Sequence, residues 1–144
     1  MRNIAIWALA TVLGTVVAAA LAALAFEDVW AIVPALFVCG AHAVFFGLPA
    51  ALFFRSRGWA SPLAAVVGGF AIGVIPLEAY QLLSERSSTV TSWSSAGPTM
   101  VNGVRTWAGW LEHIEFMVAL GGFGAGGAFA FWLTLRLFGL LDRQ

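Results

Sequence analysis

Long apolar stretches alternate with short polar breaks along this chain. Four of the stretches are long enough to cross the roughly 30 Å hydrocarbon core of a membrane, which takes about 20 helical residues. They cover residues 4–25, 30–54, 60–83 and 113–138, and the last two are separated by a long Ser- and Thr-rich segment, 84–112. The pattern predicts an all-α membrane protein, a bundle of four transmembrane helices with an outward loop, in one integral membrane domain spanning residues 1–144.

The composition agrees with this pattern. Hydrophobic residues make up 61% of the 144 residues and charged residues 10%, with a mean hydropathy of +0.92, whereas a soluble domain carries about 25% charged residues. The formal net charge is zero, so no basic field favours nucleic-acid binding. Cys39 is the single cysteine, which excludes an internal disulfide. No ligand spacing or catalytic motif predicts a metal, a cofactor or an enzyme.

The first apolar stretch has two interpretations. Ala23 and Ala25 form an Ala-x-Ala pattern that is typical of a signal-peptide cleavage site. The apolar run of about 22 residues exceeds the ~7–15 residues of a signal peptide. We therefore expect a retained first helix.

The arginines predict the orientation of the spans. If the spans alternate, Arg86 and Arg105 fall on one side of the membrane and the other five on the opposite side: Arg2, Arg55, Arg57, Arg136 and Arg143. Basic residues concentrate in cytoplasmic segments, so both termini are expected in the cytoplasm. Tryptophans are expected to anchor both interfaces: Trp7, Trp59 and Trp132 at the inner one, and Trp30, Trp107 and Trp110 at the outer one.

Small residues recur at a spacing of four in every span, and such residues let helix backbones approach closely in lipid. The third span has Gly69 and Gly73, and the last span has Gly122 and Gly126. Further small residues repeat in the same way: Gly14, Ala18 and Ala22; Ala43, Gly47 and Ala51; and Gly124 and Ala128. We expect these residues to pack the bundle or to join copies of the chain in a homo-oligomer.

The segment 84–112 has structure of its own. Asn102-Gly103 between β-branched residues is a strong hairpin signal, and the alternating "STVTSW" upstream can add a strand. The alternative is an amphipathic helix on the membrane surface, with Val101, Val104, Trp107 and Leu111 on one face.

Four titratable residues lie within the spans or at their edges, where burial costs at least about 2.5 kcal/mol unless the group is paired or hydrated. They are His42, Glu78, His113 and Glu115. At about 100° per residue, Glu115 shares a face with Gly122 and Gly126, and His113 lies nearly opposite. We therefore expect Glu115 to point into the bundle and to approach Glu78 in the outer leaflet, with His113 at the interface.

The role of these polar residues stays open at this stage. Gln81 shares a helix face with Glu78, and His42 lies midway along the second span. One interpretation is a structural cluster, in which Gln81, Arg86 or Arg105 bonds to the carboxyls and holds the outer loop on the bundle. The other is a site for a proton, a cation or a small ligand.

Three segments resemble a group of small bacterial four-span membrane proteins of uncharacterised activity. They are "AHAVFFGLPAALFFRSRGW" (41–59), "NGVRTWAGWLEH" (102–113) and "AFWLTLR" (130–136). The resemblance covers about half of the chain. It implies a shared fold and a place in the bacterial inner membrane, and it supplies no functional residues.

Two functions fit these features. The first is a non-enzymatic membrane protein that acts through partners in the bilayer, as an accessory subunit or an immunity-type protein. The alternative is an oligomeric protein that translocates a proton, a cation or a small ligand with Glu78, Glu115 and His42.

Overall fold

The computed structural model describes residues 2–27, 30, 32–85, 91–95 and 97–141. Within these residues, four helical segments are long and apolar enough to cross a membrane: Asn3–Ala25, Ile32–Ser56, Pro62–Gln81 and Trp107–Leu137. The four-helix part of the predicted fold is thereby confirmed by length and composition. Arg86 and Arg143 lie outside the described residues.

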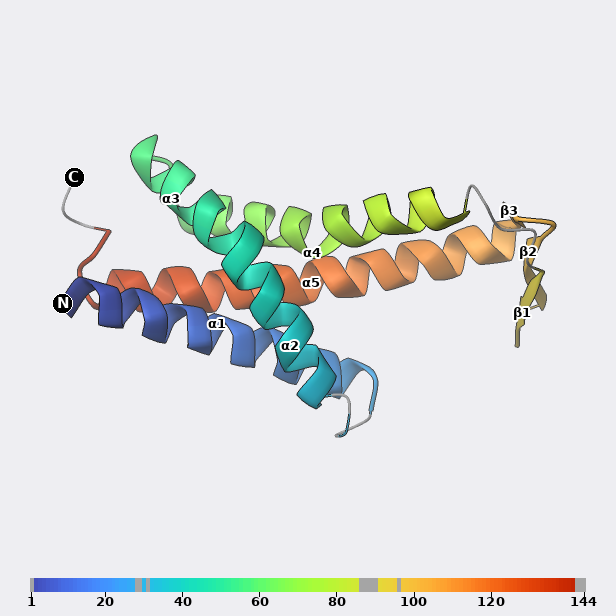
Figure 1. Ribbon diagram of the computed structural model, residues 1–144, viewed down its shortest axis with the longest axis horizontal. Coiled ribbons are helices and arrows are strands. Elements are labelled where there is room, and N and C mark those ends of the chain that lie inside the picture. Colours follow the sequence, from blue (N-terminus) through green and yellow to red (C-terminus); the bar gives the residue numbers. More distant parts are fainter. Residues whose placement is uncertain (1, 28–29, 31, 86–90, 96, 142–144) are drawn as a thin grey trace.

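Three long helices form the body of the molecule: α1 (Arg2–Ala25), α4 (Pro62–Glu85) and α5 (Trp107–Leu137). The 31 residues of α5 reach about 46 Å at 1.5 Å per residue. α5 lies between α1 and α4 and runs antiparallel to both (Figure 1). The start of α1 and the end of α5 lie at one end of the bundle, called the terminal end, and a small β-sheet lies at the other, called the sheet end.

α5 begins at Trp107, before the predicted start at His113. The hydroxyl oxygen of Thr106 accepts a hydrogen bond from the Gly109 backbone N–H at 3.1 Å. Such a cap satisfies one of the unpaired N–H groups of a first helical turn. The cap, rather than the start of the apolar stretch, sets the beginning of the helix.

Glycines bring α5 into backbone contact with both of its neighbours. A Cβ atom at Gly14 of α1 would lie 2.8 Å from the Gly127 carbonyl oxygen of α5. On the other side, a Cβ at Gly73 of α4 would lie 2.5 Å from the Leu120 carbonyl oxygen, and Gly69 touches the backbone of Gly124. These approaches require residues without side chains, so they fix which faces of the three helices meet.

The predicted small residues of α5 divide between two faces. A Cβ at Gly126 would meet the end of the Leu21 side chain of α1, whereas a Cβ at Gly122 would lie in open space. Gly124 and Ala128, which were also predicted to pack, make the contact with α4. Both pairs have the spacing of four, so the spacing alone does not distinguish them.

The second span contains a π-helical turn. It consists of α2 (Ile32–His42), the π-helical turn η2 (Ala43–Gly47) and α3 (Leu48–Ser56). The Leu48 N–H bonds to the carbonyl of Ala43, five residues earlier, immediately before Pro49. Proline has no N–H and its ring clashes with the preceding turn, which accounts for the π-helical turn. The span crosses over the other helices (Figure 1), and none of its described residues is buried.

The sheet end carries three antiparallel strands in the order β1 (Ser92–Ser94), β2 (Gly97–Val101) and β3 (Val104–Arg105). β2 and β3 are joined by Asn102 and Gly103, with φ angles of 50° and 77°. Two positive φ angles are typical of the tightest hairpin turns. The predicted hairpin is confirmed, and the alternative of a surface helix through Val101 and Val104 is wrong.

The terminal end has a buried core in which Ile6 and Ala10 of α1 pack against Leu135 and Leu140. Trp132 is also buried, with 8% of its surface exposed, and its indole N–H donates to the Ala60 carbonyl at 3.0 Å. The indole ties α5 to the turn before α4. The predicted role of Trp132 as an interfacial anchor stays a prediction.

The glycine contacts predict a sharp difference between two neighbouring positions. Gly124→Ala places a methyl group against the Gly69 backbone and should destabilise the protein by about 1–3 kcal/mol, as overpacking does. Gly122→Ala fills open space and should be neutral or gain up to about 1 kcal/mol from helix propensity. Thermal unfolding in detergent micelles measures both. Equal midpoints would show that α4 and α5 do not meet through Gly124.

Candidate functional site

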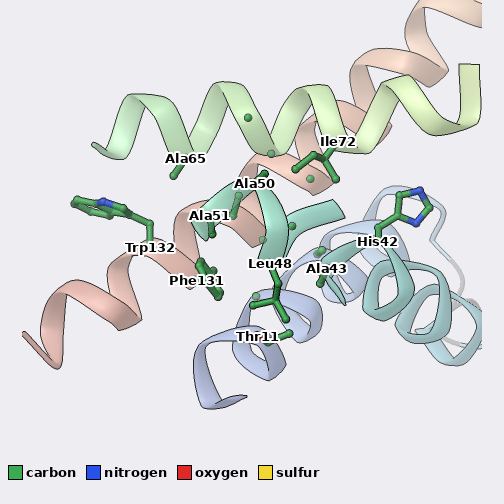
Figure 2. Close-up of a pocket in the computed structure, with 18 of the residues that line it drawn as sticks. Thr11, His42, Ala43, Leu48, Ala50, Ala51, Ala65, Ile72, Phe131 and Trp132 are labelled. Atoms are coloured by element: carbon green, nitrogen blue, oxygen red, sulfur yellow. The ribbon is translucent and has the colours of Figure 1, made fainter. Parts of the chain in front are cut away.

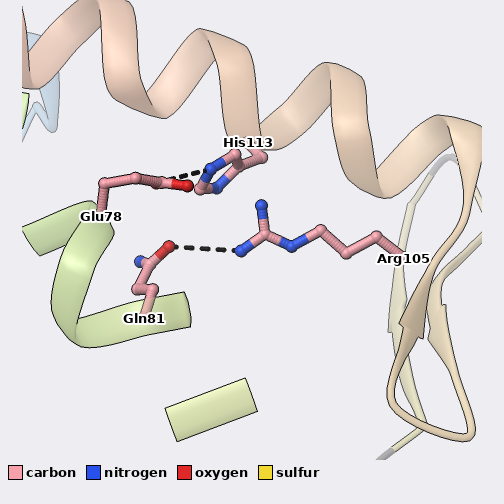
Figure 3. A network of polar contacts seen from close by, with 4 residues as sticks. All are labelled: Glu78, Gln81, Arg105 and His113. Atoms are coloured by element: carbon pink, nitrogen blue, oxygen red, sulfur yellow. Dashed lines mark hydrogen bonds and ion pairs between the residues drawn. The ribbon is translucent and has the colours of Figure 1, made fainter. Parts of the chain in front are cut away.

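Four polar side chains gather at the sheet end, where α4, α5 and β3 meet (Figure 3). Glu78 and Gln81 come from α4, one turn apart, His113 comes from the second turn of α5, and Arg105 comes from β3. We call these four residues the polar cluster. His113 faces α4 because it lies on the helix face of Leu120 and Gly124, seven and eleven residues further on.

Glu78 and His113 form the centre of the polar cluster. The Glu78 Oε2 lies 2.8 Å from the His113 Nε2. The imidazole is mostly buried, with 10% of its side chain exposed, and the carboxyl is half-buried at 27%. A carboxyl and an imidazole in contact can pair as ions or pass a proton between them. Either arrangement offsets the cost of placing these groups among apolar helices.

Arg105 joins the sheet to this pair. Its Nη2 donates to the Gln81 Oε1 at 3.3 Å, and Figure 3 shows the guanidinium between Gln81 and His113. The guanidinium also lies over the Trp110 ring, 5.2 Å from its centre, and the Trp110 ring meets the His113 ring edge-on at 5.8 Å. The cation is therefore held between an aromatic face and polar partners, which fixes β3 against α4 and α5.

Backbone contacts fix the rest of the sheet on the first turn of α5. The Thr106 N–H donates to the Thr99 carbonyl at 3.0 Å, and the Thr106 hydroxyl donates to the Pro98 carbonyl at 2.5 Å. Gly109 lies against the Thr99 backbone, so closely that a side chain there would collide with it. The Ser92 and Thr99 hydroxyls bond to each other at 2.8 Å and join β1 to β2. The sheet is therefore attached to α5 and is not a loose loop.

The structure reverses the predicted positions of His113 and Glu115. His113 faces α4, and Glu115 is exposed, so the expected approach of Glu115 to Glu78 is wrong. Glu115 does share its side of α5 with Gly122 and Gly126, but that side faces α1, and α1 ends at Ala25, beside Gly122. Glu115 lies beyond the end of α1 and has no helix to face.

The other candidates divide between two places. Gln81 belongs to the polar cluster, whereas His42 lines a cavity beneath the second span (Figure 2) and its Nδ1 lies 2.8 Å from the Val38 carbonyl oxygen. Arg105 was expected only as one possible partner of the carboxyls, and Arg86 lies outside the described residues. Among the described residues, no three His, Cys, Asp or Glu side chains gather in a way that could hold a metal ion.

Removal of the His113 imidazole should lower the stability of the protein, whereas removal of the exposed Glu115 carboxyl should not. His113→Ala leaves the half-buried Glu78 carboxyl without its partner and should cost about 1–3 kcal/mol, less than the ~3–5 kcal/mol for a fully buried pair. Glu115→Ala, two residues away on the exposed side, should change the free energy of unfolding by less than about 0.5 kcal/mol. Thermal unfolding in micelles compares them. A larger loss in Glu115→Ala would contradict this assignment of the α5 faces.

Comparisons with known proteins leave the site to be interpreted from its own chemistry. No protein-family model, no curated protein and no solved structure matches this chain.

Proposed function

We propose that this chain is a non-enzymatic integral membrane protein that acts through a partner protein at its sheet end, as an accessory subunit or an immunity-type interaction protein. In this proposal it lies in the bacterial cytoplasmic membrane with both termini in the cytoplasm and the sheet outside. The described arginines support this orientation, because Arg55 and Arg136 lie in the last turns of α3 and α5, which end at the terminal end, and Arg57 directly follows α3.

The observation that carries the proposal is an apolar pair on the outer face of the sheet. Val101 and Val104 are directly paired across β2 and β3, and they are 42% and 69% exposed. Neighbouring residues of a strand point to opposite faces, and Arg105 reaches toward the bundle. Val104 and Val101 therefore face away from the helices, where a membrane-embedded bundle has no lipid to cover them.

The attachment of the sheet to α5 supports the same function. A small apolar patch on a rigid support needs little ordering when it binds, and that preserves affinity. β1 and β3 are the edge strands of the sheet, so their backbone groups can also pair with a strand of a partner. Trp93 of β1, which is 72% exposed, adds an aromatic side chain of the kind enriched at interfaces.

Site-specific photo-crosslinking in the native cells tests the proposal. A photoreactive residue at Val104 should give a discrete protein adduct, whereas one at Val67, which is 60% exposed on α4, should give none or a different one. Val101→Ser should weaken the Val104 adduct, because it removes half of the apolar pair.

The same cells check the orientation. In a Cys39→Ala background, a membrane-impermeant maleimide should label a cysteine placed at Ser95 and not one placed at Ser56. Identical adducts at Val104 and Val67, or labelling at Ser56 alone, would refute the proposal.

A second function is favoured by one specific contact. The Glu78–His113 pair is a titratable group between two spanning helices, as expected in a protein that translocates a proton, a cation or a small ligand. In proteoliposomes with a trapped pH dye, the wild-type protein should then dissipate an imposed pH gradient. Glu78→Gln should abolish the flux, and Glu115→Gln should keep it. Membranes that stay tight with the wild-type protein would exclude proton flux.

A further inference from the structure

An apolar cavity of about 200 Å³ lies beneath the second span, between α1, α3, α4 and α5 (Figure 2). Its wall consists largely of small and aliphatic side chains, among them Ala51, Ala65, Leu48 and Ile72. Apolar cavities of about 150 Å³ in proteins stay dry and take up hydrocarbon guests of the size of benzene. The volume and lining of this cavity suit a segment of hydrocarbon.

The cavity lies where the second span crosses the other helices at an angle (Figure 1) instead of packing along them. The residues that α3 turns toward α4 and α5 include Ala50 and Ala51, which are too small to fill the gap. Protein interiors contain few voids of this size because the lining atoms lose their contacts, so an occupant would stabilise this arrangement.

One end of the cavity carries a positive charge. Arg55 belongs to the lining, and its guanidinium lies over the Trp7 ring, 5.8 Å from the ring centre. Trp59, which also lines the cavity, is 58% exposed. These residues lie at the terminal end, at the level where lipid headgroups meet the helices of a spanning bundle. Among the described residues that line the cavity, the basic side chains are Arg55 and His42.

From this combination we infer that the cavity binds an anionic phospholipid, with a segment of one acyl chain beneath α3 and the phosphate against Arg55. An apolar space with a single cation at its headgroup-level end is complementary to an amphipathic anion, and basic pockets between spanning helices are known sites for anionic headgroups. The inference concerns a different end of the molecule from the proposed docking sheet and does not depend on it.

Thermal unfolding of the delipidated full-length protein in micelles tests the inference, with phosphatidylglycerol and phosphatidylcholine of identical chains as probes. Phosphatidylglycerol should raise the unfolding midpoint of the wild-type protein at lower concentration than phosphatidylcholine does. Native mass spectrometry should show one retained phosphatidylglycerol per chain. Equal effects of the two lipids, or a dimer of the chain that retains no lipid, would overturn the inference.

Two matched pairs of variants separate the parts of the site. Ala51→Leu fills the cavity and should abolish stabilisation by both lipids, whereas Ala41→Leu, on the exposed side of the same span, should keep it. Arg55→Gln should reduce the preference for phosphatidylglycerol about fivefold, the effect of one arginine near an anionic group. Arg57→Gln should leave the preference unchanged, because Arg57 stacks on Phe53 outside the lining.

The arginine pair remains decisive even if Ala51→Leu fails to fold. Equal lipid preference in Arg55→Gln and Arg57→Gln would overturn the assignment of the phosphate to Arg55. Equal lipid stabilisation of Ala51→Leu and Ala41→Leu would overturn the assignment of the chain to the cavity.

Discussion

The close backbone contact of α5 with both of its neighbours governs this structure. Gly127 meets Gly14 on one side, and Gly124 meets Gly69 on the other. Helices in lipid gain little from the hydrophobic effect and associate through close packing. Because a single added methyl group would collide with backbone atoms at these positions, α1, α4 and α5 can meet in this way only at one rotation and one register.

The polar cluster follows from that rotation. With Gly124 turned toward α4, His113 on the same face comes into contact with Glu78. The first turn of α5 then presents Gly109 and Trp110 to the sheet, and Arg105 can reach across to Gln81. The position of the sheet therefore depends on the glycine contacts between α4 and α5, which lie at a distance from it. A change in the glycine contacts would be expected to move the outer face as well.

The second span takes no part in the backbone contacts between α1, α4 and α5. The two ends of the molecule differ in their chemistry. The sheet end offers a small apolar face on a rigid support, which suits a protein partner. The terminal end offers a cavity under α3 with Arg55 at its mouth, which suits a lipid. The cavity lies where the second span crosses the other helices, and the small residues that line it leave it unfilled.

The sequence by itself determined the local elements. An apolar run of about 20 residues has one stable solution in lipid, since a helix satisfies all of its backbone hydrogen bonds internally, and Asn102-Gly103 fits the positive φ angles of a tight hairpin. The site was predicted in part: Glu78, Gln81 and a bond from Arg105 follow from position along the chain, but the partner of Glu78 does not.

Only the tertiary structure decided which face of α5 turns inward. The pair Gly122 and Gly126 and the pair Gly124 and Ala128 both consist of small residues at a spacing of four, so the pattern along α5 cannot rank them. Gly69 and Gly73 on α4 select the second set, because their backbones fit against Gly124 and its neighbours. His113 is thereby turned toward Glu78 and Glu115 is exposed, since residues two apart on a helix point to nearly opposite sides. The cavity likewise depends on how the second span crosses three other helices, which no local sequence pattern encodes.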